Sequence, residues 1–272
     1  MYFLKSVIDI LVVLLLLRLL IRPNEALFNP IYGLIYRVTD FLLTPSRYVT
    51  RNSMPGVLLT VLALVVLRGT IYVSLKPMPF VSGVGISLLS FFQFLFQVYM
   101  VMWFIWVLTQ AGFGPSFSRM IDRAFTPLDF LFGRLGFARN RFRLLVFLFL
   151  WILYSVLSIL VRSAFIARAG FPAFTFVDSL AEGLLLVLVL FPFPGFFSLV
   201  IVVGVLLSWV NPDPSNPIVQ AIYGISEPLL MPFRRVVPHL GGMDFSPLVA
   251  LLCFQILGWV GYQLIDSITK AI

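Results

Sequence analysis

Hydrophobic and polar residues along this chain are segregated into long blocks. The long apolar runs lie at about residues 2–21, 55–75, 84–109, 143–166, 179–209 and 246–266. A helix needs about 20 apolar residues to cross a bilayer, and hydrocarbon offers the backbone no hydrogen-bond partner other than itself. The pattern therefore predicts an all-α polytopic membrane bundle of about six transmembrane helices. The first run is longer than the core of a signal peptide, so we expect it to be retained as a span.

The fifth run is unusual because it is too long for one span and is interrupted. It contains Pro192, Pro194 and Gly195 within the string FPFPGF. Proline removes a helical hydrogen bond and kinks or breaks a helix. We expect this run to be kinked, or divided into an interfacial piece and a shorter span.

Composition agrees with membrane insertion and excludes several other classes. The chain is 61% hydrophobic and 11% charged, and it has a formal net charge of +8. Its basic residues form no dense tract interleaved with aromatic residues, so we expect no nucleic-acid partner. The one cysteine, Cys253, lies in an apolar run, which excludes a disulfide framework and a paired-cysteine metal site within the chain.

The long connections 22–54, 110–142 and 210–245 resemble one another. The first and third share an Asn-Pro start, an acidic residue, a second proline and an arginine. The matched pairs are Asn29 with Asn216, Pro30 with Pro217, Asp40 with Glu227, Pro45 with Pro232, and Arg47 with Arg235. The middle connection fits if one residue is inserted, which places Pro127 on Pro228 and Arg134 on Arg235. We predict three repeat units, 1–77, 78–168 and 169–272, each a span, an amphipathic segment and a span.

Each long connection has the apolar periodicity of a short amphipathic helix. In the third, one face is apolar and the other is polar or small: Ile218, Ile222, Ile225 and Leu229 against Gln220, Gly224 and Glu227. Such helices suit the membrane interface. We expect Asn29 and Asn216 to cap them, Pro45 and Pro232 to end them, and Asp244 to cap the following span.

Residues 208–251 closely resemble the YggT family of small bacterial membrane proteins, which has relatives in chloroplasts. The resemblance rests on an Asn-Pro start, an acidic-Pro pair, a Pro-x-Arg-Arg turn and a Gly-Gly-Met-Asp-Phe-Ser-Pro string. These are Asn216, Pro217, Glu227, Pro228, Pro232, Arg234, Arg235 and residues 241–247, which include Asp244. Family members typically carry two repeats, so the middle unit here is an addition. The resemblance implies roles in osmotic-stress tolerance, in cell division and envelope processes, or in assembly of a chloroplast b-type cytochrome.

Basic residues are distributed unequally between the two sets of connections. Twelve arginines belong to the long connections, against five basic residues in or near the other connections and the termini. By the positive-inside rule the amphipathic segments face the cytoplasm, as in a bacterial inner-membrane protein. Arginine favours bidentate contact with phosphate, so we expect these segments to bind anionic lipid headgroups. A protein partner is the alternative.

A few polar residues lie within the apolar runs, where charge is costly. Asp9 and Arg68 are expected to form a structural ion pair, and Arg18 is placed to reach a lipid phosphate. Gln93 and Gln97 lie one helical turn apart, which suits hydrogen bonds between helices or the lining of a solute pathway. Outside the spans, Glu227 is expected to brace Arg235, and Asp40 to brace Arg47. Glu182 is expected to be solvated.

The sequence contains no motif that indicates catalysis. HExxH, GxSxG and P-loop strings are absent and His239 is the only histidine, so we expect a non-enzyme that binds no cofactor or metal. The favoured function is a scaffold or assembly factor in envelope or membrane-protein biogenesis, which binds lipids, another membrane protein or a second copy of itself. The alternative is a channel or transporter that responds to osmotic stress. We expect the repeats to lack the broken mid-membrane helices that build substrate sites in transporters, which favours the scaffold.

Overall fold

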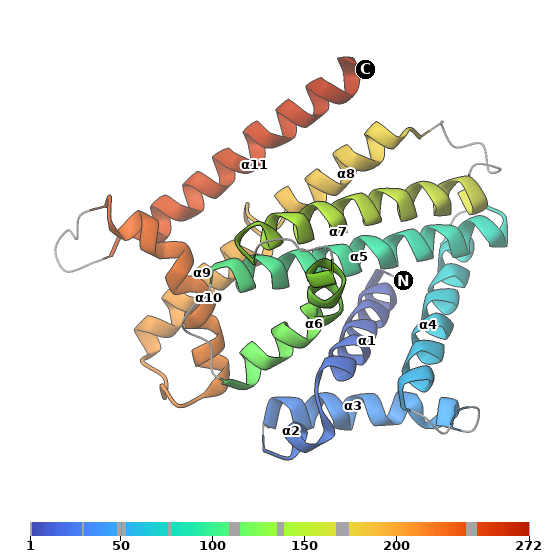
Figure 1. The fold of residues 1–272 in the computed structure, drawn as a ribbon, viewed down its shortest axis with the longest axis horizontal. Helices are drawn as coiled ribbons and strands as arrows, with labels where there is room; N and C mark the ends of the chain where they lie inside the picture. Colours follow the sequence, from blue (N-terminus) through green and yellow to red (C-terminus); the bar gives the residue numbers. More distant parts are fainter. Residues whose placement is uncertain are drawn as a thin grey trace. The chain divides into compact units, whose positions relative to one another are not determined.

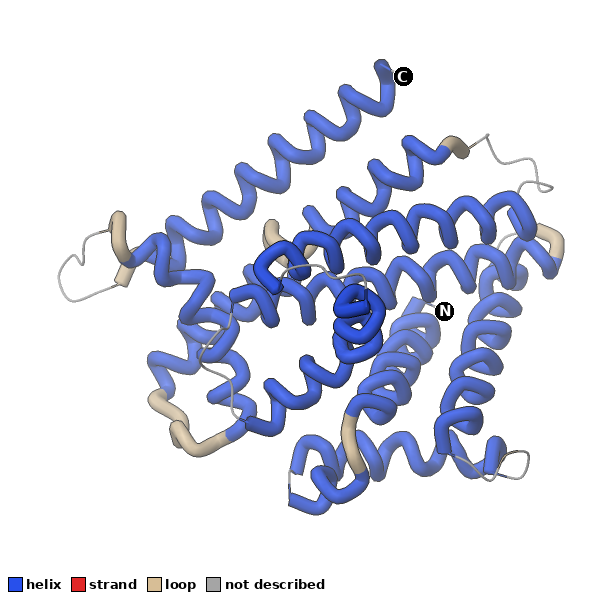
Figure 2. Tube along the Cα trace, viewed as in Figure 1, coloured by secondary structure: helices blue, strands red, loops and turns tan. Residues whose placement is uncertain are grey.

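The computed structural model describes residues 2–28, 30–47, 50, 53–75, 78–108, 115–134, 139–166, 174–237 and 244–271. Every regular element in these ranges is a helix, as Figures 1 and 2 show. The helices are α1 (Tyr2–Leu20), α2 (Pro23–Phe28), α3 (Pro30–Arg47), α4 (Ser53–Leu75), α5 (Phe80–Leu108), α6 (Pro115–Arg134), α7 (Arg139–Val161), the π-turn η1 (Arg162–Ile166), α8 (Phe176–Leu188), α9 (Phe196–Val210), α10 (Pro217–Arg234) and α11 (Ser246–Ala271). The predicted all-α class is confirmed.

Within the described ranges, four helices are long and apolar enough to cross a membrane. They are Met54–Ser74, Phe80–Leu108, Arg143–Ile166 and Ser246–Lys270. Helix α1 coincides with the first predicted span, but Lys5, Asp9 and Arg18 lie within its 19 residues. The chain is thus a multi-pass membrane protein with four candidate spans, and the predicted total of six is not confirmed.

The fifth apolar run is divided into two helices, as its prolines predicted. Helix α8 has 13 residues and α9 has 15, so each is shorter than the roughly 20 residues that a span needs. The turn between them satisfies its own backbone: Phe197 N donates to Leu190 O at 2.9 Å, and Ser198 Oγ donates to Phe191 O. The expectation that the repeats lack broken mid-membrane helices stays a prediction, because the two helices alone do not fix the depth of this break in a bilayer.

The chain forms two compact units, and the first consists of Met1–Phe92 with Leu157–Ala173. Here α3 lies across the ends of α1 and α4 and packs against both, as Figure 1 shows. Leu15, Leu43 and Val57 are buried at this junction, in one apolar cluster. Helix α3 is therefore held by packing on two neighbouring helices as well as by its own sequence.

The second unit consists of Gln93–Val156 with Phe174–Ile272. In it α10 packs on α9 and α11, and α11 also packs on α8. The contact between α9 and α10 is close, because a Cβ atom at Gly204 would lie 3.0 Å from Ser226 Oγ. Small residues at such contacts let helix backbones approach each other in a membrane protein. The division into three repeat units was made from sequence alone and stays a prediction.

Candidate functional site

Helix α10 begins as its sequence predicts. The Asn216 side chain accepts a hydrogen bond from the N–H of Ile218 at 2.9 Å, and Pro217 occupies the first turn. An asparagine cap satisfies one of the free N–H groups at a helix start, and proline there loses nothing. The corresponding Asn29 lies outside the described residues, although Pro30 does begin α3.

The prolines inside the amphipathic helices do not end them, which corrects the expectation for Pro45 and Pro232. Helix α3 continues past Pro45 to Arg47, and α10 continues through Pro228 and Pro232 to Arg234. Proline in a helix removes one hydrogen bond to the carbonyl four residues earlier. Few backbone hydrogen bonds of the helix follow a proline that lies close to its C-terminus. We infer that packing on the neighbouring helices outweighs the cost of the one hydrogen bond that the proline removes.

Arg234, at the end of α10, joins two acidic residues from different parts of the chain. Its Nε donates to Asp244 Oδ2 at 2.8 Å, and its Nη2 donates to Glu227 Oε1 at 3.2 Å. Nη1 also contacts the second oxygen of Glu227, which makes that pair bidentate. Asp244 Oδ1 accepts from the N–H of Ser246 at 2.9 Å. We call Glu227, Arg234 and Asp244 the Arg234 cluster; it links the end of α10 to the start of α11.

Charge and hydrogen bonding shift the pKa values of this cluster in opposite directions. The hydrogen bond to Glu227 raises the pKa of Arg234 above its ordinary value. Burial pushes the pKa of Asp244 upward, but hydrogen bonds from Ser246 and Arg234 outweigh it and hold this pKa below its usual range. Both groups are therefore charged at neutral pH, as an ion-pair brace requires.

The expected pairing of Glu227 with Arg235 was wrong. Glu227 pairs with Arg234, whereas the contact found for Arg235 runs from Nη2 to Met231 Sδ at 3.8 Å. A closer reading of the repeat would have found this. One offset of 187 residues relates Pro30 to Pro217 and Asp40 to Glu227, and it places Arg47 on Arg234.

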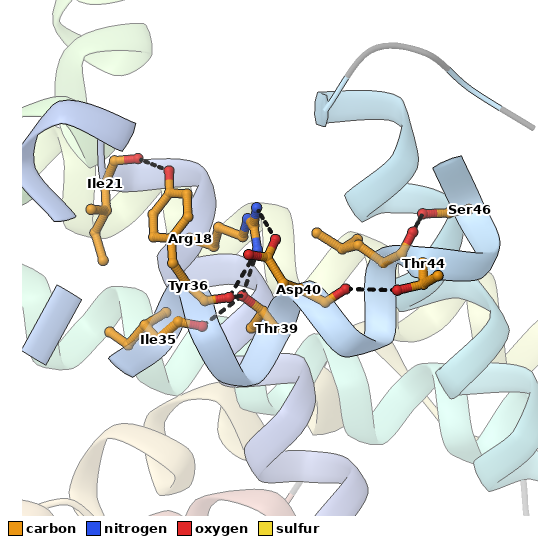
Figure 3. A network of polar contacts seen from close by, with 9 residues as sticks. Arg18, Ile21, Ile35, Tyr36, Thr39, Asp40, Thr44 and Ser46 are labelled. Atoms are coloured by element: carbon orange, nitrogen blue, oxygen red, sulfur yellow. Dashed lines mark hydrogen bonds and ion pairs between the residues drawn. The ribbon is translucent and has the colours of Figure 1, made fainter. Parts of the chain in front are cut away.

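The first unit also has an arginine bound to its amphipathic helix, but from a different element (Figure 3). Arg18 of α1 contacts Asp40 Oδ1 at 2.8 Å, donates to Thr39 Oγ1 at 2.8 Å, and lies 4.3 Å from the centre of the Tyr36 ring. These contacts replace the expected reach of Arg18 to a lipid phosphate, because the side chain is turned onto α3. The side chain of Arg47 lies outside those described, so its pairing with Asp40 stays a prediction.

The hydroxyl of Tyr36 also belongs to this network. It donates to the carbonyl oxygen of Ile21 at 2.9 Å, beyond the end of α1 (Figure 3). Burial raises the pKa of Tyr36 above its ordinary value, and the charge of Arg18 partly opposes this shift. Tyr36 thus stays protonated and acts as a donor.

Helix α6, which belongs to the predicted middle repeat, ends with an exposed arginine over an aromatic ring. The guanidinium carbon of Arg134 lies 4.7 Å from the centre of the Phe130 ring, one helical turn earlier. Both residues are exposed. Pro127 lies inside the helix, as Pro228 does in α10.

Polar residues of the apolar helices pair with one another. Arg68 of α4 forms an ion pair with Asp9 of α1, and its side chain is 6% exposed. A charge in a hydrophobic segment needs such a partner. Nε of Arg68 is buried and makes no hydrogen bond among the described residues.

Gln93 and Gln97 of α5 each bond to α8. Gln93 Nε2 donates to Glu182 Oε1 at 2.9 Å, and Gln97 Nε2 donates to the carbonyl of Leu186 at 3.3 Å. Tyr154 of α7 donates to the other oxygen of Glu182 at 2.9 Å. Glu182 is thus hydrogen-bonded between helices, and the expectation that it is merely solvated was wrong. No periodicity in the sequence pairs it with Gln93; they are 89 residues apart.

Among the described residues, no group of three His, Cys, Asp or Glu side chains is arranged to hold a metal ion. The arrangement at the Arg234 cluster is suited to fixing the angle between two helices. Its chemistry is that of ion pairing and hydrogen bonding. Arg235, and separately Arg134 at the end of α6, are exposed beside apolar side chains.

Comparison with known proteins assigns this region to a family. A family model described as CCB3/YggT matches residues 183–265, which contain the turn between α8 and α9 and the whole Arg234 cluster. No solved structure matches the chain. The match therefore rests on sequence, and it covers the Arg234 cluster but not Arg18, Asp40 or Arg134.

Individual bacterial proteins match different lengths of the chain. An uncharacterized protein of Pseudomonas aeruginosa is 50% identical over 62 residues, which are 23% of this chain and 30% of that protein. The uncharacterized protein YggT of Escherichia coli is 38% identical over 58 residues, 21% of this chain and 30% of that protein. The chain thus spans about a third of the length of these relatives. An uncharacterized protein from the proC 3′ region of Vibrio alginolyticus is 30% identical over 165 residues, 60% of this chain and 86% of that protein. Together with the residues matched by the family model, this coverage shows that the chain belongs to the CCB3/YggT family.

Proposed function

We propose that this protein is a non-enzymatic membrane scaffold or assembly factor, acting in envelope or membrane-protein biogenesis at a bacterial inner membrane. Its helices α3, α6 and α10 form a cytoplasmic platform that binds lipid headgroups or a membrane partner. The observation that carries this proposal is that α3 and α10 are each tied to their neighbours by an arginine ion pair: Arg18 with Asp40, and Arg234 with Glu227 and Asp244. Such ties hold an amphipathic helix at a fixed angle.

The outward faces of these helices support the same proposal. On α3, Arg37 is exposed between Leu34, which is 59% exposed, and Phe41, which is 82% exposed. On α10, Met231 is 52% exposed next to Arg235. Apolar side chains beside arginine fit a lipid interface or a membrane protein better than bulk water.

A photo-crosslinking experiment in native membranes tests this proposal. A photoreactive residue replaces Phe41, Phe130 or Met231, and Leu252 on α11 is the matched exposed control. The scaffold predicts a discrete adduct, with lipid or with one membrane protein, from the three amphipathic helices. The control should give only diffuse lipid labelling. Labelling indistinguishable from the control at all three positions would reject the platform.

The channel or transporter alternative is favoured by one observation, the division between α8 and α9. Discontinuous helices build substrate sites in many transporters by leaving backbone groups free. Here, however, the turn uses its carbonyls internally: Leu190 O accepts from Phe197 N at 2.9 Å, and Phe193 O accepts from Gln255 Nε2 at 3.3 Å. The break is therefore better explained as a structural bend. Solute uptake by proteoliposomes of purified protein, abolished by a Gln93→Leu/Gln97→Leu double substitution, would instead establish transport.

A further inference from the structure

The C-terminal ends of α6 and α10 each carry an arginine in contact with an apolar side chain. In α6, Arg134 lies over the ring of Phe130; in α10, Arg235 contacts the sulfur of Met231. In both pairs the apolar residue precedes the arginine by four positions, which is one helical turn. The sequence alignment that places Pro127 on Pro228 also places Phe130 on Met231 and Arg134 on Arg235. The two pairs therefore occupy equivalent positions of the second and third predicted repeat units.

Among the described residues, the guanidinium groups of these two pairs make no ion pair with a carboxylate. An arginine has five N–H donors in a planar fork. The contacts found for Arg134 and Arg235, among the described residues, are with a ring face and a thioether, and neither of these is a strong acceptor. By contrast, the adjacent Arg234 gives its donors to Glu227 and Asp244. Of the two adjacent arginines, Arg234 thus forms ion pairs with two carboxylates, whereas Arg235 forms none among the described residues.

The apolar member of each pair determines which anion fits. Phe130 is 65% exposed and Met231 is 52% exposed. A free phosphate would leave these side chains in water, whereas a phospholipid brings acyl chains beside its phosphate. Each pair also precedes a candidate span, Arg143–Ile166 or Ser246–Lys270. Both arginines therefore lie in the chain shortly before a membrane entry.

We propose that Phe130 with Arg134, and Met231 with Arg235, are two equivalent binding sites for an anionic phospholipid. The arginine fork takes the phosphate oxygens in bidentate contacts, and the apolar neighbour contacts the upper acyl chain. This inference rests on the proposed placement of α6 and α10 at the membrane interface. It adds to the proposed function the residues that bind lipid and the number of sites, and it excludes Arg234 from lipid binding. The corresponding positions of the first unit are Thr44 and Tyr48, so that unit has no such site.

Native mass spectrometry of the purified full-length protein tests the two sites. The protein is released from detergent micelles doped with phosphatidylglycerol or, separately, phosphatidylcholine, and retained lipids are counted. The wild type should retain two phosphatidylglycerol molecules in preference to phosphatidylcholine. Arg134→Gln and Arg235→Gln should each lose one, with binding at the changed site weakened about tenfold, as loss of a charge-assisted contact implies. The double variant should lose both.

Matched variants separate this inference from simpler explanations. Lys270→Gln removes one positive charge from an exposed residue of α11, and it should retain two lipids. Phe130→Ser and Met231→Ser should each weaken binding while keeping the charge; if they do not and inorganic phosphate competes fully, the sites are phosphate sites and the inference is wrong. A double arginine variant that still retains two lipids would overturn the inference alone. A wild type that shows no preference for phosphatidylglycerol would overturn both the inference and the lipid-binding part of the proposed function.

Discussion

At the scale of single residues, the main result is that two adjacent arginines have different surroundings. Arg234 contacts two carboxylates, whereas Arg235 contacts a methionine sulfur. Residue type does not distinguish them, and the position in the sequence does so only through the offset of 187 residues between the first and third connections. The difference arises because only one side chain at the end of α10 points toward both Glu227 and the start of α11.

The two arginines should therefore contribute unequally to stability. Arg234→Gln removes two partly exposed ion pairs and should lower the free energy of unfolding by about 1 kcal/mol. Arg235→Gln, which changes charge equally, should lower it by less than about 0.5 kcal/mol. Thermal unfolding of both variants in the same detergent measures this. Equal losses would show that the Arg234 cluster does not stabilise the fold.

The lowered pKa of Asp244 predicts a pH dependence of stability. A carboxyl group whose pKa is lower in the folded state stabilises the fold above its unfolded pKa, which is about 3.9. That contribution is lost as the pH falls through the lowered value. Between pH 5 and pH 3, the unfolding temperature of the wild type should therefore fall more steeply than that of Asp244→Asn. Parallel curves for the two proteins would contradict the role of Asp244.

The ion pair between Asp9 and Arg68 should depend on both partners. Arg68→Gln leaves a carboxylate without its partner among apolar helices and should destabilise by about 3 kcal/mol. The double variant Asp9→Asn/Arg68→Gln should recover part of this loss, because no charge is then left unpaired. A double-mutant cycle by thermal unfolding measures the coupling. Additive losses would mean that the two residues do not interact.

At the scale of elements, sequence patterns predicted most of the helices but not all of their ends. The apolar periodicity identified α3, α6 and α10, and the FPFPGF string identified the division between α8 and α9. Proline preference alone ended α3 and α10 too early, because it does not include packing on neighbouring helices. The partners of Arg18 and Glu182 were also missed, since those contacts join segments with no shared spacing.

The contact between α9 and α10 gives a prediction at this scale. Gly204→Leu would force a side chain against Ser226, because even a Cβ atom there lies 3.0 Å from the serine oxygen. Overpacking of this kind costs about 1–3 kcal/mol. The preceding Val203 is exposed, so Val203→Leu is a matched control that should unfold like the wild type. If the two variants unfold alike, α9 and α10 are not closely packed.

At the scale of the whole molecule, the chain is a multi-pass membrane protein that also contains amphipathic helices. Among the described residues, four helices suit membrane spanning by length and apolarity. The CCB3/YggT family model matches residues 183–265, which include most of the last of these helices. The sequence predicted this class from run lengths and charge. Its total of six spans is not confirmed, because run length alone does not separate a charged helix such as α1, or a divided one such as α8 with α9, from a continuous span.

The placement of α3, α6 and α10 along one face of the membrane is a prediction, and cysteine labelling tests it directly. In a Cys253→Ser background, single cysteines replace the exposed residues Thr44, Thr126 and Gln220, with Ser267 on α11 as the opposite-face control. A membrane-impermeant maleimide is applied to right-side-out and inside-out vesicles. The cysteines on the three helices should react only from the cytoplasmic side, and the cysteine at position 267 only from the other side. A reaction of any of the three from the opposite side, or protection from both sides, would contradict it.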